Sequence, residues 1–163
     1  MGCDIHVKIE CKEKQDGKWV WQDYTPMYQR PKLTKDDDLP EYEDYFIGGR
    51  CYDAFALLAG VRNYNGIVPI SEPKGVPDDM SESVQREYET WGKECHSHSY
   101  YTLMELEYYC AMHSVVAREW QDDEEILPTK ELLRPYLLAL NFVHEHIWTV
   151  DKNAIRMVFW FDN

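Results

Sequence analysis

Hydrophobic and polar residues alternate at both ends of the chain. Residues 3–11 follow the two-residue period of a half-buried strand, and residues 18–24 supply a returning strand after the turn-forming residues 15–17. Residues 154–163 alternate again, but they are apolar on both faces. A strand of that kind lies in the centre of a sheet.

The middle of the chain carries helical patterns separated by two long irregular segments. Thr102 and Glu105 have the spacing of a capping box, in which the threonine hydroxyl accepts from a backbone N–H of the first turn. Prolines, glycines and charged residues dominate the irregular segments 25–50 and 61–80, which have the length of lids or binding loops. The expected helices span 52–59, about 81–91, 102 to about 120 and 129–146.

These elements predict one α+β domain over residues 1–163. Its small, mainly antiparallel sheet would consist of the N-terminal hairpin and the C-terminal strand, with about four helices on one face and two long irregular loops. Pairing of the last strand with the first would bring Asp4 and His6 close to Asp162.

The net charge limits the kinds of molecule that the protein is expected to bind. Thirty acidic residues against seventeen basic ones give a formal charge of −13. Such a chain repels phosphate backbones, so we expect no direct contact with nucleic acid. The charge suits three other roles: attraction of cations, including catalytic metals; occupation of a basic protein partner by mimicry of a nucleic acid; and solubility.

Cysteine usage and hydropathy indicate the compartment. The five cysteines are odd in number and irregular in spacing, and no apolar run approaches the roughly 18–20 residues of a membrane span. The chain opens without the charged and apolar regions of a secretory signal. We therefore expect a cytoplasmic protein with free thiols and no membrane contact.

Two histidine motifs suggest a metal site. Asp4 and His6 lie two apart on the first strand, and His96 and His98 lie two apart on an extended segment, so each pair is expected to project to one side. Imidazole with carboxylate favours Zn, Mn, Fe or Ni. Nearby carboxylates are candidates for a general base on a metal-bound water or for a further ligand. These candidates are Glu94, Glu10 and Asp162.

Basic and aromatic residues beside these motifs are candidate ligand contacts. Arginines and an amide in the irregular segments can receive a phosphate or carboxylate, and tyrosines beside the second histidine pair can stack on a ring. The candidates are Arg50, Arg62, Asn63, Tyr100 and Tyr101.

The same residues also suit structural roles. Asp4 can cap a turn, His6 can stack on a tryptophan of the N-terminal hairpin, and His96 and His98 can be surface loop residues. The arginines can pair with acids across loops, and the tyrosines can anchor the start of the following helix.

Four segments together resemble a family of uncharacterised small proteins from bacteriophages and bacterial genomes. They are Met1-Gly2-Cys3-Asp4-Ile5-His6, Phe55–Asn63, Trp91–Leu106 and Phe159-Trp-Phe-Asp-Asn163. The resemblance spans nearly the whole chain in order and implies a small phage-type cytoplasmic protein. It brings no established activity with it.

Two functions fit the pattern, beside a third interpretation as a small structural or accessory protein in which the histidine motifs only stabilise loops. The first is a metal-dependent hydrolase of a small phosphorylated or nucleotide-like substrate, with the four motif residues as ligands. The second is a non-enzymatic phage-type binder, either an acidic inhibitor of a host defence protein or a sponge for a nucleotide signal.

Overall fold

A four-stranded antiparallel sheet with strand order β2-β1-β6-β5 forms the centre of the protein. The computed structural model describes residues 2–25, 28–31, 42–45, 47–120, 127–147 and 151–163. The strands are β1 (Ile5–Gln15), β2 (Lys18–Asp23), β3 (Tyr28–Pro31), β4 (Tyr42–Tyr45), β5 (Cys95–Thr102) and β6 (Ile155–Asp162). The helices are α1 (Tyr52–Ala59), α2 (Glu82–Trp91), α3 (Leu103–Met112) and α4 (Thr129–His146), with short 3-10 turns η1 (Gly92–Glu94) and η2 (Lys152–Ala154). The predicted α+β class and the small antiparallel sheet are confirmed.

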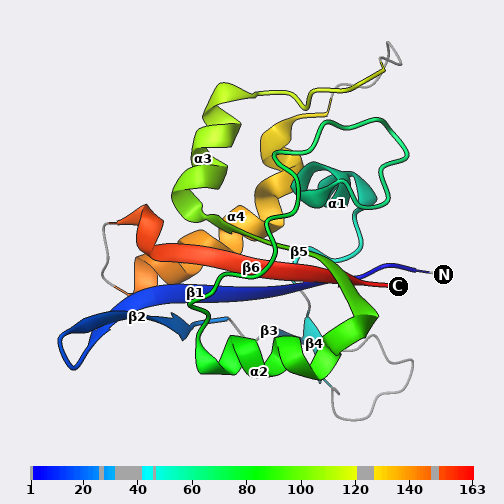
Figure 1. The fold of residues 1–163 in the computed structure, drawn as a ribbon. Coiled ribbons are helices and arrows are strands. Elements are labelled where there is room, and N and C mark those ends of the chain that lie inside the picture. The colour runs from blue at the N-terminus through cyan, green and yellow to red at the C-terminus, as the bar shows by residue number, and fades with distance from the viewer. Residues whose placement is uncertain (1, 26–27, 32–41, 46, 121–126, 148–150) are drawn as a thin grey trace.

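The C-terminal strand lies in the centre of the sheet, as its apolar pattern predicts. β6 pairs with β1 on one side and β5 on the other, and seven of its eight residues are buried. Its pairing with β1 sets His6 opposite Trp160. The backbone N–H of Asp162 also donates to the carbonyl of Asp4, at 3.1 Å. The two ends of the described chain therefore lie side by side, as Figure 1 shows.

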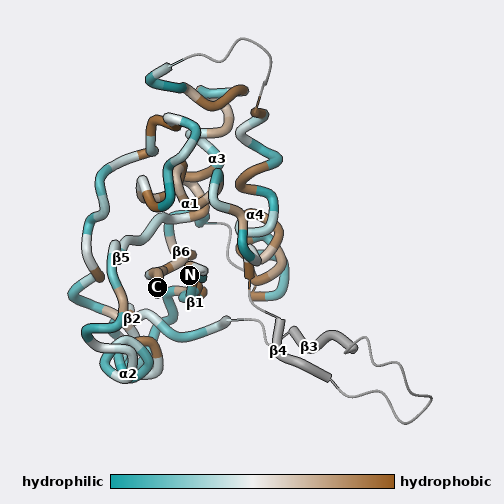
Figure 2. Tube along the Cα trace, turned by 90° about the vertical axis from the view of Figure 1, so that its right-hand side faces the viewer, coloured by the Kyte–Doolittle hydropathy of each residue, from teal (hydrophilic) through white to brown (hydrophobic). Residues whose placement is uncertain are grey.

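Helices cover both faces of the sheet, so the expectation that all lie on one face is wrong. α1, α3 and α4 lie on one side and α2 on the other (Figures 1 and 2). Phe159 and Phe161 of β6 belong to the larger core with α1, α3 and α4, whereas Val158 and Trp160 pack with Val84 of α2. Residues that alternate along β6 thus enter two cores, which is why both of its faces are apolar.

The starts of α2 and α3 follow the sequence signals, but the end of α3 does not. Ser81 accepts a hydrogen bond from the Val84 N–H, and Thr102 accepts one from the Glu105 N–H, so both side chains cap their helices. α3 ends at Met112 rather than near residue 120. The chain pairs instead with the segment before α4, through the isolated bridge Val115↔Pro128. β-branched residues at 115 and 116 favour that extended pairing.

Two further differences concern strands. Residues 95–102, expected to be extended, form the fourth strand of the sheet. Residues 25–50, expected to be irregular, contain the two-stranded pair β3 and β4.

Residues 61–80 lack helices and strands, as predicted. Within the described residues, no helix is long and apolar enough to cross a membrane.

Candidate functional site

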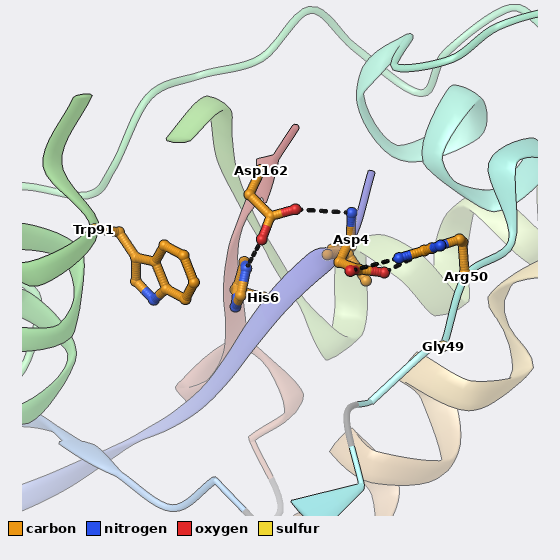
Figure 3. Close-up of a pocket in the computed structure, with 7 residues that line it drawn as sticks. Asp4, His6, Gly49, Arg50, Trp91 and Asp162 are labelled. Carbon is orange, nitrogen blue, oxygen red and sulfur yellow. Dashed lines mark hydrogen bonds and ion pairs between the residues drawn. The ribbon is translucent and has the colours of Figure 1, made fainter. Parts of the chain in front are cut away.

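A pocket of about 330 Å³ opens at the end of the sheet where the two chain ends lie together. Its walls come from β1, the end of β6, the end of α2 and the segment before α1 (Figure 3). The lining residues are Asp4, Ile5, His6, Gly49, Arg50, Trp91 and Asp162. Four of them were predicted as site residues: Asp4, His6, Arg50 and Asp162.

An aspartate–histidine pair forms the centre of this pocket. His6 Nε2 lies 2.9 Å from Asp162 Oδ2, and the other carboxylate oxygen of Asp162 accepts the backbone N–H of Asp4 at 3.0 Å. The Asp162 carboxylate is therefore held by His6 of β1 and by Asp4, the residue before that strand. This placement confirms that pairing of the terminal strands brings Asp162 to Asp4 and His6.

Two tryptophans fix the imidazole ring. The His6 side chain is only 9% exposed, and its ring centroid lies 4.2 Å from that of Trp91 and 6.3 Å from that of Trp160. The structural alternative from the sequence was stacking of His6 on a tryptophan of the hairpin, whereas these two tryptophans belong to α2 and β6. Ring packing against the tryptophans and the contact with the Asp162 carboxylate together orient the imidazole.

Arg50 and Asp4 form a two-pronged ion pair at the other side of the pocket (Figure 3). Arg50 Nε donates to Asp4 Oδ1 at 2.8 Å, and Nη2 donates to Oδ2 at 2.7 Å. Hydrogen bonding from Arg50 holds the pKa of the Asp4 carboxyl below its ordinary value. Both side chains are 51% exposed. Exposed ion pairs contribute little net free energy, so Asp4 holds the guanidinium only weakly.

Glycines make room for this arginine. A Cβ atom added at Gly2 would lie 2.5 Å from Arg50 Nη1, so the guanidinium lies against a backbone that has no side chain. Gly48 and Gly49 precede Arg50 with φ angles of 90° and 55°. These left-handed conformations favour glycine and turn the chain so that Arg50 reaches the pocket.

The second histidine motif does not deliver two imidazoles to one side, so that expectation is wrong. Between the pairs His96↔Phe161 and Ser99↔Phe159, three steps along β5 match two along β6, and Ser97 adopts a φ of 53°. This bulge sends the two rings to opposite faces. His96 stacks on Phe161, whereas His98 contacts Trp160.

Neither of these histidines lines the pocket. His96 Nε2 lies 3.3 Å from the side-chain oxygen of Asn163, and His98 lies edge-on to Tyr88 with ring centroids 5.0 Å apart. Burial lowers the pKa of His98, and the nearby His96 lowers it further.

Glu10, a predicted base, belongs to a buried ion pair elsewhere on the sheet. Its carboxylate is fully buried, accepts from Arg156 Nε at 2.8 Å and accepts from the Ser81 N–H at 2.6 Å. Arg156 also donates to Asp79 at 2.9 Å. This network ties the segment before α2 to the sheet. Glu94 is exposed in η1 and is not among the residues that line the pocket.

The remaining predicted ligand contacts also lie outside the pocket. Arg62 donates to the Asn163 side chain at 3.4 Å, and the Asn63 side chain both donates to and accepts from the backbone of Ile67, closing a tight loop. Tyr100 and Tyr101 receive the ammonium of Lys74 on their rings, at 4.4 and 4.3 Å. The tyrosines thus hold the segment of Lys74 beside β5, a role different from the predicted anchoring of the following helix.

Sequence reasoning missed the wall formed by Trp91, Ile5 and Gly49. A tryptophan at the end of a polar helix and a glycine pair before an arginine were the available signals. Neither signal locates its residue in space.

Three residues that line the pocket have side chains that can bind a metal: Asp4, His6 and Asp162. In the part of the chain that the structure describes, no three such side chains are already arranged around a common point. In the structure, Asp4 bonds to Arg50 while Asp162 bonds to His6.

All five cysteines are free thiols, and four of them are buried.

Searches against protein-family models, curated proteins and solved structures found no match to this chain. The resemblance to small phage proteins stays a prediction, and the case for function comes from the pocket.

Proposed function

We propose that the protein is a hydrolase of a small phosphorylated substrate and that this pocket is its active site. The observation that carries the proposal is the His6–Asp162 pair, 2.9 Å apart, in a pocket that also holds Arg50. A buried imidazole oriented by a carboxylate can act as a general base, and a guanidinium beside it can receive a phosphate. The two groups supply the two requirements of phosphoester hydrolysis, which are water activation and charge stabilisation.

The reaction assigns His6 the two proton transfers and gives one role each to Asp162 and Arg50. The imidazole of His6 takes a proton from water as the water oxygen forms a bond to phosphorus. The ester P–O bond breaks, and the leaving oxygen takes a proton from the imidazolium, which gives an alcohol and inorganic phosphate. Asp162 stabilises the transient imidazolium, and Arg50 neutralises charge on the non-bridging oxygens.

A divalent metal defines a second form of the same proposal. Zn, Mn, Fe or Ni would take ligands from Asp4, His6 and Asp162, and the metal rather than His6 would then activate the water. The formal charge of −13 supports this form, because an acidic protein attracts cations and a bound cation attracts phosphate. Elemental analysis of the purified protein, together with the effect of a chelator on activity, separates the two forms.

Release of inorganic phosphate tests the proposal. General-base catalysis contributes roughly 10²–10⁴-fold, so His6→Gln and Asp162→Asn should each lose activity on that scale. His146→Gln, on the exposed end of α4, is the matched control and should retain it. Circular dichroism confirms folding of each variant.

Two results would contradict the hydrolase. One is the absence of phosphate release from a broad panel, with and without each metal. The other is activity that survives in a folded His6→Gln variant. Saturable binding without turnover would instead support the non-enzymatic binder, either a nucleotide sponge or an acidic inhibitor of a basic host protein. The cytoplasmic location, inferred from the thiols, belongs to both versions.

A further inference from the structure

We propose that the ligand of this pocket is a nucleoside monophosphate, with its base against Trp91 and its phosphate on Arg50. This inference rests on the proposed function and names its substrate class.

The pocket has an aromatic side and a cationic side. Figure 3 shows Trp91, from the end of α2, and Arg50, from the segment before α1, on opposite sides of His6 and Asp162. A ligand that uses both sides needs a planar apolar group at one end and an anionic group at the other. The bond between its sugar and phosphate would then lie over His6.

The aromatic side is suited to a nucleobase. Trp91 is half-buried and lines the pocket, and its ring lies 4.2 Å from that of His6. The His6 ring covers one side of Trp91 and holds it in place, and a base would stack on the rest of the tryptophan surface, since every base has a π-face and stacking needs no particular hydrogen-bond pattern. Stacking there would place the rest of the ligand beside the imidazole.

The cationic side is suited to a terminal phosphate. The planar guanidinium of Arg50 binds the two oxygens of Asp4 at 2.8 and 2.7 Å. Phosphate offers oxygens in the same two-pronged geometry. The phosphate would take the position that the carboxylate of Asp4 now holds against the guanidinium.

The volume limits the size of the ligand. At about 330 Å³, the pocket is at the lower end of the roughly 300–1,000 Å³ range of small-molecule sites. That volume favours a mononucleotide over a dinucleotide or a larger cofactor.

Adenosine 5′-monophosphate and ribose 5-phosphate provide the test, because the second lacks only the base. We expect kcat/KM, or affinity if turnover is absent, to favour the nucleotide by roughly tenfold, the usual scale of base stacking. Trp91→Ala should remove this preference by weakening the nucleotide alone. Trp91→Phe should keep most of it, and Arg50→Ala should weaken both compounds in parallel. Trp19→Ala is the matched control, since Trp19 is 65% exposed on β2 and does not line the pocket.

The outcomes separate this inference from the hydrolase proposal. Equal hydrolysis of the two compounds by the wild-type protein would overturn the nucleotide and leave the hydrolase standing. Tighter binding of the nucleotide without turnover, dependent on Trp91, would support the nucleotide and overturn the hydrolase. Absence of both binding and hydrolysis would overturn both. If Trp91→Ala does not fold, the Trp91→Phe variant and the wild-type preference still decide.

Discussion

Replacement of Arg156 by methionine is expected to destabilise the protein strongly. The arginine is 4% exposed, and its partner Glu10 is fully buried. Removal of the guanidinium leaves the carboxylate in the interior with a hydrogen bond from the Ser81 N–H. It also removes the contact with Asp79 and the stacking of Arg156 on Trp21, whose centroid lies 3.8 Å from the guanidinium carbon.

The magnitude follows from the burial of the pair. Loss of one partner of a buried ion pair costs about 3–5 kcal/mol, because an uncompensated charge stays inside. Domains have about 5–15 kcal/mol of stability in all. At about 2–4 °C per kcal/mol for a chain of this size, the midpoint of thermal unfolding should fall by roughly 6–20 °C.

Urea unfolding, followed by circular dichroism, measures the effect. The double variant Glu10→Gln/Arg156→Met should lose much less than the sum of the two single variants, because it leaves no buried charge unpaired. Strict additivity, or a loss below about 1 kcal/mol in Arg156→Met, would refute the reasoning.

Three further predictions concern single residues in and around the sheet and its pocket. Gly2→Ala places a Cβ 2.5 Å from Arg50, so the arginine should leave Asp4, and NMR titration should show the Asp4 pKa rising toward its ordinary value; an unchanged pKa would contradict this. Burial lowers the pKa of His98 in the folded protein, so the unfolded state takes up the proton at a higher pH than the folded state does. Stability should therefore fall as the pH drops below the ordinary value near 6.5, and a folded His98→Asn variant should lose this part of the pH dependence. Cys51 is the exposed thiol and should react with iodoacetamide before the four buried ones, as mass spectrometry of the native protein would show; equal labelling of all five would contradict the burial.

Three of the four strands of the sheet and half of the pocket were predictable because they depend on local patterns. Alternation identified β1, and apolar residues on both faces identified β6 as central. Antiparallel pairing of the two ends then follows, and it places Asp162 beside His6. No long-range information beyond that pairing was needed.

The rest depends on single residues and on the path of the chain. One left-handed residue, Ser97, places His96 and His98 on opposite faces, and serine gives no signal for that conformation. Arg50 meets Asp4 across 46 positions of sequence through a glycine turn. Trp91 reaches the pocket because α2 crosses the second face of the sheet, which the apolar pattern of β6 permits but does not specify.

NMR with orthovanadate, an analogue of the phosphoryl transition state, tests most directly whether this pocket is the active site. A titration followed by ¹H–¹⁵N spectra should show saturable shifts at the backbone amides of His6 and Arg50 and at the indole N–H of Trp91. The amides of β2 and of the exposed end of α4 should stay unchanged, and Asp162→Asn should weaken the binding. Shifts confined to other surfaces, or no shifts at saturating vanadate, would contradict the assignment of the pocket.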